Sequence, residues 1–204
     1  MTSLVVVSAG LSTPSSTRLL ADGLTAATVA VMGEVEVTHI ELRDLAHQLT
    51  DHLLTGFPGQ ELAAAQAAVA AADGLIIVTP VFSASYSGLF KTFFDVLETG
   101  ALDGKPVLVA ATAGTPRHSL VLEHALRPLF AYLHAVVVPT GVFAATDDFA
   151  GTDLDHRVSR AAGELAALMG TVSPVDSNTR RRTVENEFAA PTPFEELLRQ
   201  ASAA

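Results

Sequence analysis

The chain has 204 residues, of which 49% are hydrophobic and 17% charged, and its formal net charge is −10. Its length suits one domain, since domains commonly hold about 100 to 200 residues, and its apolar content excludes disorder over most of the chain. Twelve Lys and Arg residues scattered along an acidic sequence argue against nucleic-acid binding, which needs clustered basic side chains. Without cysteine, the chain has no disulfide, thiolate metal site or cysteine nucleophile.

The sequence opens on an apolar run, Leu4–Val7, with no basic segment before it. No apolar run reaches the roughly 18 residues that a membrane span needs. We therefore expect a cytoplasmic protein that does not bind membranes.

Short β-branched runs alternate with longer runs rich in Ala and Leu, a pattern typical of strand–helix units that build a parallel sheet. We expect strands at residues 4–8, 34–41, 74–79, 106–112 and 136–143. We expect helices at residues 16–32, 60–72, 87–98, 119–134 and 155–169. The run 74–79 is entirely apolar except for its last residue, which predicts a central strand buried on both faces. The pattern predicts an α/β fold.

The composition changes after Pro174, where an arginine triplet and two further prolines follow. We expect one domain at residues 1–173 and a C-terminal tail at residues 174–204, interpreted as a surface segment. In the alternative, the triplet binds a phosphate, and the tail docks on a neighbouring subunit through Phe188, Phe194, Leu197 and Leu198.

Three loops carry the candidate chemistry. In an open parallel sheet, ligands bind beyond the carboxyl ends of the strands, where the loops after the first, third and fourth strands meet. The first loop is rich in hydroxyls and leads into a helix, whose unpaired amides and positive dipole end can bind an anion without a basic side chain. Its candidate residues are Ser8, Ser12, Ser15, Ser16 and Thr17. The alternative is that Ser15 or Ser16 merely caps the helix.

The second loop sets two aromatic side chains among small residues, which indicates a surface for a flat heterocycle. In the third loop, Gly114 lets the backbone approach a ligand closely, and His118 stands at a helix start. The alternative for His118 is a capping or surface role without chemistry. The candidate residues are Pro80, Val81, Phe82, Ser83, Ser85, Tyr86, Thr112, Ala113, Gly114, Thr115 and His118.

Motifs of competing functions are absent. The sequence has no GxGxxG after the first strand, no GxxxxGK[ST], no GxSxG and no HExxH, which argues against a dinucleotide-binding Rossmann fold, an NTPase, a hydrolase and a zinc peptidase. His47, Asp51 and His52 are interpreted as a solvated polar face, so we expect no metal site.

The stretch TPVFSASYSGLFKTFFDVLETGAL, the following TAGTPRHSLVLEHALRPLF and the loop Ser8–Arg18 resemble the NAD(P)H-dependent FMN reductases. The likeness is closest to members that supply reduced flavin to two-component monooxygenases, such as the partner of alkanesulfonate monooxygenase. This resemblance implies a flavodoxin-like three-layer sandwich with a five-stranded parallel sheet in the order 2-1-3-4-5. It also implies a homodimer or homotetramer.

The resemblance implies that the first loop holds the FMN phosphate through Ser15, Ser16 and Thr17. It implies further that the second and third loops flank the ribityl chain and the isoalloxazine, through Pro80, Val81, Phe82, Ser83 and Ser85 and through Thr112, Ala113, Gly114, Thr115 and His118. Hydride transfer from NADPH or NADH needs two stacked rings rather than an acid and a base, so we expect no catalytic side chain. A flavodoxin-type electron carrier and a quinone or azo reductase are the alternatives.

Three details stay open. His124 stands where some of these reductases carry an inserted tyrosine, so FMN is either an exchanging substrate or a bound cofactor. Arg117 and the arginine triplet are candidates for binding the 2′-phosphate of NADPH. The helix with Lys91 and the helix with His124 are implied to lie near the oligomer interface, and the first either fills the core or faces a partner through Phe90, Phe93, Phe94 and Leu97.

Overall fold

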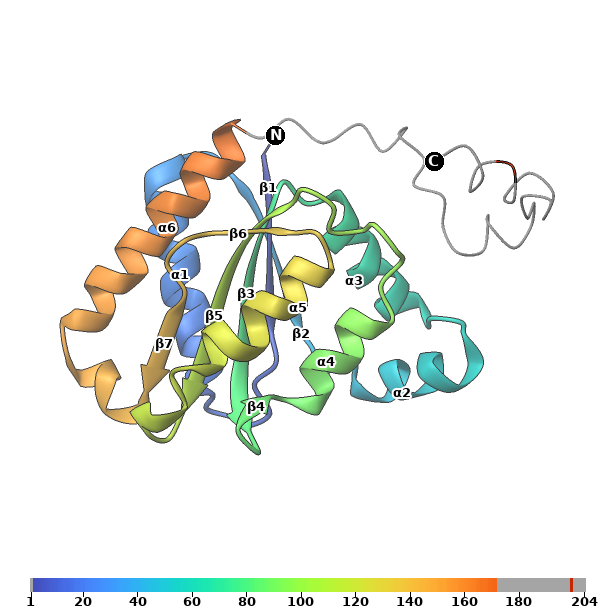
Figure 1. The fold of residues 1–204 in the computed structure, drawn as a ribbon, viewed down its shortest axis with the longest axis horizontal. Helices are drawn as coiled ribbons and strands as arrows, with labels where there is room; N and C mark the ends of the chain where they lie inside the picture. Colours follow the sequence, from blue (N-terminus) through green and yellow to red (C-terminus); the bar gives the residue numbers. More distant parts are fainter. Residues whose placement is uncertain (1, 172–198, 200–204) are drawn as a thin grey trace. The chain divides into compact units, whose positions relative to one another are not determined.

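The computed structural model describes residues 2–171 and residue 199 of the chain. Within residues 2–171, a sheet lies between two layers of helices (Figure 1). The strands are β1 (Ser3–Ser8), β2 (Glu36–Glu41), β3 (Gly74–Phe82), β4 (Ser85–Tyr86), β5 (Pro106–Ala113), β6 (Val136–Val137) and β7 (Val142–Ala145). The helices are α1 (Ser16–Met32), α2 (Ala46–Thr55), α3 (Gln60–Ala71), α4 (Gly88–Asp95), α5 (Arg127–Tyr132) and α6 (Asp153–Thr171), with short helical turns η1 (Pro116–His118), η2 (Leu122–Leu126) and η3 (Thr146–Ala150).

The predicted tail, with its arginine triplet and its four apolar side chains, lies outside the described residues. No described helix is both long and apolar enough to cross a membrane.

The parallel strands lie in the order β2-β1-β3-β5-β6, and β7 continues the fifth position beside β5. This confirms the expected flavodoxin-like order, because β5 is the fourth predicted strand and β6 and β7 are the two parts of the fifth. The short β4 pairs with β3 in the antiparallel direction. The order reverses between β1 and β3, which places a crevice beyond the carboxyl ends of these strands.

Alternate side chains of β1 enter two separate cores. Val5 and Val7 pack in the core under α2, α3, α4 and α5, whereas Leu4 and Val6 pack in the core under α1 and α6. All four are at most 2% exposed. Because both faces of the strand are buried, it reads as a continuous apolar run rather than an alternating one.

The phenylalanines of α4 fill the core. Phe90 and Phe93 are fully buried, and Phe94 is 3% exposed. The ring of Phe94 lies 4.8 Å from that of Phe90 and 5.0 Å from that of Phe130 on α5, centroid to centroid. The rings of Phe90, Phe93 and Phe94 are thus buried within the chain, and they do not support a surface for a partner subunit.

The predicted strand 136–143 is wrong in its middle, where the chain leaves the sheet between β6 and β7. Pro139 has no amide to donate to a neighbouring strand. Between β6 and β7, the backbone of residues 138–140 forms hydrogen bonds to side chains of helices on both sides of the sheet instead. Glu164 on α6 accepts from the amide (2.7 Å) and hydroxyl (2.8 Å) of Thr140, and Arg127 on α5 donates to two carbonyl oxygens of the break.

The predicted helix 119–134 is also interrupted. The chain forms the turn η1, the π-helical turn η2 and only then the regular helix α5. Pro128 cannot donate the hydrogen bond that a continuous α-helix requires, which accounts for an irregular turn just before it.

Two elements were not predicted. Helix α2 was missed because, of its ten residues, Leu49 alone is buried, so the apolar period is weak. The hairpin between β3 and β4 was missed because its turn lacks glycine and asparagine, although Ser83 (φ 48°) and Ala84 (φ 68°) both adopt the left-handed conformation of a primed hairpin turn.

We expect the hydrogen bonds between Thr140 and Glu164 to make the stability of the fold depend on pH. Burial on its own opposes the charge of Glu164, but hydrogen bonds from Thr140 and Arg160 outweigh it and hold the pKa of this carboxyl below its ordinary value of 4.5. A lowered folded-state pKa stabilises the fold above 4.5, and the contribution is lost as the pH falls through the folded pKa. Glu164→Gln should therefore reduce the free energy of unfolding at neutral pH by about 1 kcal/mol.

Urea unfolding at several pH values tests this expectation, with Glu98→Gln as a control at an exposed carboxylate. The difference between wild type and Glu164→Gln should shrink below pH 4.5. An undiminished difference at lower pH would show that the charge of Glu164 contributes nothing.

Candidate functional site

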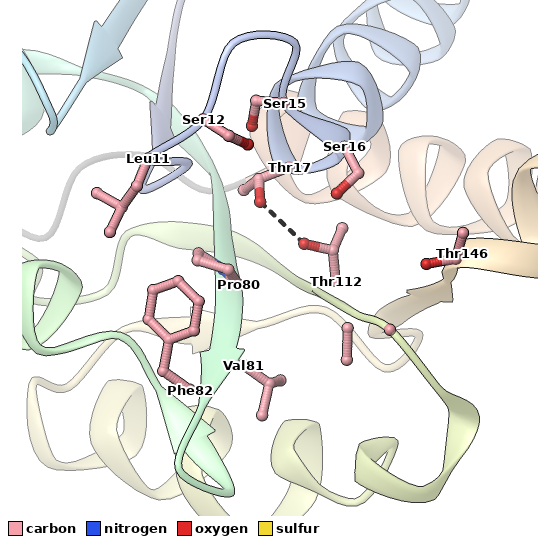
Figure 2. Close-up of a pocket in the computed structure, with 12 residues that line it drawn as sticks. Leu11, Ser12, Ser15, Ser16, Thr17, Pro80, Val81, Phe82, Thr112 and Thr146 are labelled. Carbon is pink, nitrogen blue, oxygen red and sulfur yellow. Dashed lines mark hydrogen bonds between the residues drawn. The ribbon is translucent and has the colours of Figure 1, made fainter.

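A cavity of about 340 Å³ lies at the carboxyl ends of the central strands (Figure 2). Its volume falls in the range of small-molecule sites, about 300 to 1,000 Å³. The lining residues are Leu11, Ser12, Ser15, Ser16, Thr17, Pro80, Val81, Phe82, Thr112, Ala113, Gly114 and Thr146. None of these side chains is ionisable, so the cavity can bind an anion only through neutral donors.

The first wall is the start of α1. The hydroxyl of Ser15 caps the helix by accepting from the amide of Arg18 at 3.2 Å. The amides of Ser16 and Thr17 precede the first hydrogen bond of the helix, and no group in the described part of the chain accepts from them. Unpaired amides at the positive end of a 17-residue helix are suited to binding a phosphate or carboxylate.

Gly10 lets the loop close over the helix start. A Cβ atom at this position would lie 2.1 Å from Oγ of Ser15 and 3.2 Å from Cβ of Thr17. Only glycine leaves room for the Ser15 cap, which explains why a hydroxyl-rich loop before α1 contains this glycine.

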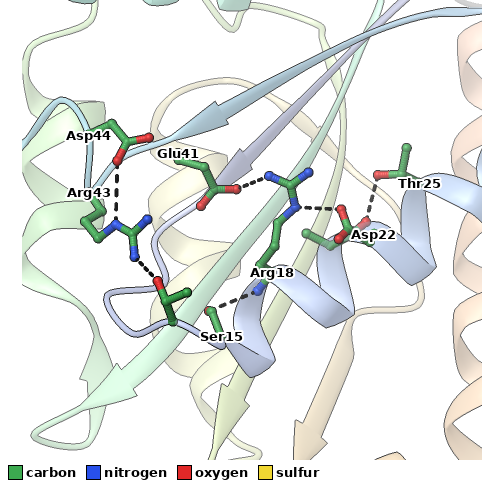
Figure 3. A network of polar contacts seen from close by, with 9 residues as sticks. Ser15, Arg18, Asp22, Thr25, Glu41, Arg43 and Asp44 are labelled. Atoms are coloured by element: carbon green, nitrogen blue, oxygen red, sulfur yellow. Dashed lines mark hydrogen bonds and ion pairs between the residues drawn. The ribbon is translucent and has the colours of Figure 1, made fainter.

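Arginines beside the loop are bound to acidic and hydroxyl groups of the chain (Figure 3). Arg18 pairs with Glu41 and Asp22, each at 2.6 Å, and its hydrogen bonds to these two carboxylates raise its pKa. Arg43 donates to the hydroxyl of Thr13 at 2.6 Å, which braces the loop from outside. Neither arginine lines the cavity, so its interior stays neutral.

The second wall is the end of β3, with Pro80, Val81 and Phe82. Phe82 and Leu11 are 47% and 48% exposed, and Figure 2 shows both on the same side of the cavity. Two half-exposed apolar side chains at the rim suit a flat ring that is only partly withdrawn from water.

The third wall is the end of β5. The hydroxyls of Thr17 and Thr112 form a hydrogen bond of 2.9 Å, and the two residues are 2% and 3% exposed (Figure 2). This bond joins the start of α1 to the end of β5. At Gly114 an added Cβ atom would meet no protein atom within 4 Å, so the backbone there faces open space.

The structure brings ten of the sixteen predicted site residues to the cavity. The six that do not line it are Ser8, Ser83, Ser85, Tyr86, Thr115 and His118. Ser8 is 1% exposed, and its hydroxyl has no partner among the described residues. The ring of Tyr86 packs on Phe90, with centroids 5.6 Å apart. The roles of all sixteen stay predictions.

Two lining residues, Leu11 and Thr146, were not predicted. Leu11 lies in the first loop, but its apolar side chain does not suit a phosphate. Thr146 directly follows β7, whose Ala145 pairs with Ala113 of β5. The signal was available, because a fifth strand extended to Ala145 places the next residue at the same sheet edge.

Known proteins resemble this chain over most of its length. Residues 2–150 match the family model described as NADPH-dependent FMN reductase. An FMN reductase (NADPH) of Pseudomonas aeruginosa is 39% identical, covering 82% of this chain and 92% of its own length. The NADH-dependent FMN reductase SfnF of Pseudomonas fluorescens is 40% identical, with the same two coverages. The solved structure of an oxidoreductase from Corynebacterium diphtheriae has a TM-score of 0.81 and 53% identity, covering 85% of this chain and 99% of its own.

Removing the hydroxyl bond between α1 and β5 should destabilise the chain. In Thr112→Val the buried hydroxyl of Thr17 loses its partner, so we expect the free energy of unfolding to fall by about 1 to 3 kcal/mol. Urea unfolding measures this change. Thr112→Ser keeps a hydroxyl and should cost less, and a Thr112→Val variant as stable as wild type would show that the hydrogen bond contributes nothing.

Proposed function

Because the chain belongs to the NADPH-dependent FMN reductase family, we propose that it binds FMN in the cavity described above and reduces it with NADPH or NADH. The main support for this proposal is the start of α1, where hydroxyl groups and amides with no acceptor in the described part of the chain lie at one end of a neutral cavity with an apolar rim. When bound, FMN supplies the acceptor for the hydride of the nicotinamide.

The start of α1 would hold the FMN phosphate. The amides of Ser16 and Thr17 and the hydroxyls of Ser12 and Ser16 offer donors at the positive end of the helix, and no carboxylate lines the cavity. Hydrogen bonds from neutral donors to a charged acceptor contribute about 1.5 to 3 kcal/mol each. Such a site binds a phosphate in an acidic protein without a lysine or arginine.

The other two walls would hold the ring system. Pro80 and Phe82 border one side, and the backbone at Gly114 can approach the other because no side chain intervenes. Amides beside the ring stabilise the negative charge that develops there on reduction. Since no lining side chain is ionisable, the cavity contributes orientation and electrostatics rather than proton transfer.

We also propose that reduced FMN leaves the protein and serves a separate monooxygenase. The half-exposed rim formed by Leu11 and Phe82 supports an exchanging flavin over a permanently enclosed one. Self-association into a homodimer or homotetramer belongs to the same proposal. It is supported by strongly exposed apolar side chains at the end of α2 and just after it, where Leu54 is 82% and Phe57 is 79% exposed.

The test of the proposed activity is to mix the purified protein with NADPH or NADH and FMN, and to follow the loss of reduced nicotinamide. We expect oxidation that saturates with added FMN. A flavodoxin-type carrier would retain FMN and oxidise neither nucleotide quickly, and a quinone or azo reductase would need its own acceptor in addition to FMN. Absence of FMN-dependent oxidation with both nucleotides would contradict the proposal.

Gly114→Val should weaken FMN binding without destabilising the fold. The added side chain meets no protein atom near Cβ but intrudes on the space proposed for the flavin, so we expect at least a tenfold rise in the FMN dissociation constant, about 1.4 kcal/mol. Quenching of flavin fluorescence measures the affinity, and urea unfolding measures the stability. Gly23→Val, on the exposed face of α1, is the matched control. Unchanged FMN affinity in Gly114→Val would count against the placement of the ring.

A further inference from the structure

We propose that the guanidinium of Arg117, three residues along the chain from Gly114 of the cavity wall, binds a phosphoryl group of the nicotinamide dinucleotide. This inference rests on the proposed function, because it assigns a residue to the reductant rather than to the flavin. The ligand is a phosphoryl group of one of two kinds. The 2′-phosphate occurs in NADPH alone, and the pyrophosphate occurs in both NADPH and NADH.

The electrostatics of the chain call for a cation at this place. The net charge is −10, and among the described residues no basic side chain lines the cavity. A dinucleotide with two phosphates, or three in NADPH, is repelled by such a protein unless a local positive charge meets it. The bare amides at the start of α1 are already assigned to the phosphate of FMN, so the reductant needs a separate donor.

Arg117 is the basic residue that remains available. Within residues 2–171, Arg117 alone among the arginines and lysines forms neither an ion pair nor a hydrogen bond. The other basic residues of this range are bound to carboxylates, a hydroxyl or carbonyl oxygens of the chain: Arg18, Arg43, Lys91, Lys105, Arg127, Arg157 and Arg160. An exposed arginine that has no partner among the described residues is free to bind a phosphate through its planar fork of donors.

The backbone presents Arg117 from an anchored turn. It lies in η1, three residues after Gly114 of the cavity wall. Pro116 begins the turn, and its carbonyl oxygen accepts from the amide of Ser119 at 3.0 Å. Farther along, Val121 is buried in the core, at 5% exposure. The turn is thus tied to β5 on one side and to the core on the other, which anchors the backbone of Arg117 three residues from Gly114.

Two acidic residues, Asp147 and Asp148, follow β7, which pairs with β5, the strand that leads to Arg117. Neither of them pairs with Arg117. Asp148 accepts from the amide of Ala145 at 2.8 Å and pairs with Arg157 at 3.5 Å. Asp147 forms no ion pair with Arg117 in the described part of the chain.

The test compares wild type, Arg117→Gln and Arg117→Lys with each reductant at saturating FMN, and measures binding of NADP⁺ and NAD⁺ to the FMN-loaded protein by calorimetry. We expect Arg117→Gln to raise KM and the dissociation constant about fivefold to tenfold, with kcat and FMN affinity little changed. Arg117→Lys should recover part of the loss, and the effect should shrink at high ionic strength because exposed charges are screened.

Equal losses with both nucleotides identify the pyrophosphate as the ligand, and a loss confined to NADPH and NADP⁺ identifies the 2′-phosphate. Arg160→Gln, which removes an exposed arginine from α6, is the matched control and should change neither. Unchanged KM and binding in Arg117→Gln, or a loss of FMN affinity instead, would overturn the inference while the wild-type activity still stands. Wild type that oxidises neither reductant would overturn the proposed function, and calorimetry with NADP⁺ and NAD⁺ would still decide on Arg117.

Discussion

The hydrogen bond between the hydroxyls of Thr17 and Thr112 joins the two elements on which the cavity depends. It is 2.9 Å long, both residues are almost fully buried, and it connects the start of α1 to the end of β5 past the intervening β3. Because one hydroxyl donates to the other, only one proton of the pair remains for a ligand. The bond therefore fixes the distance between the proposed phosphate end and the third wall before any flavin enters.

Charged side chains surround the cavity, but none is among the described residues that line it. Arg18 and Arg43 lie close to the first loop, yet both are bound to carboxylates or hydroxyls of the chain. The bare amides at the start of α1 supply positive potential without a cation, which suits a bound phosphate in a chain of net charge −10. Arg117, which has no partner among the described residues, is the cation proposed for a second anionic ligand.

The sequence predicted the parts of the fold that follow from periodicity and left out those that follow from tertiary contacts. The apolar run 74–79 is central, and the strand order is as expected. The break at Pro139 depends on hydrogen bonds from two helices that no local pattern reveals, and Thr146 reaches the cavity only through the pairing of β7 with β5. Ser8 is different, because the alternation of β1 alone places it on the same face as Leu4 and Val6, which pack in the core under α1 and α6.

In the proposed complex, neutral donors at the start of α1 hold the phosphate of FMN. The most direct measurement compares the dissociation constants of FMN and riboflavin, which share the ring and ribityl chain and differ in the phosphate. We expect FMN to bind about tenfold to a hundredfold more tightly than riboflavin, as expected for one or two hydrogen bonds to a charged acceptor. Equal affinity for the two flavins would contradict this expectation, because the start of α1 would then contribute nothing to binding.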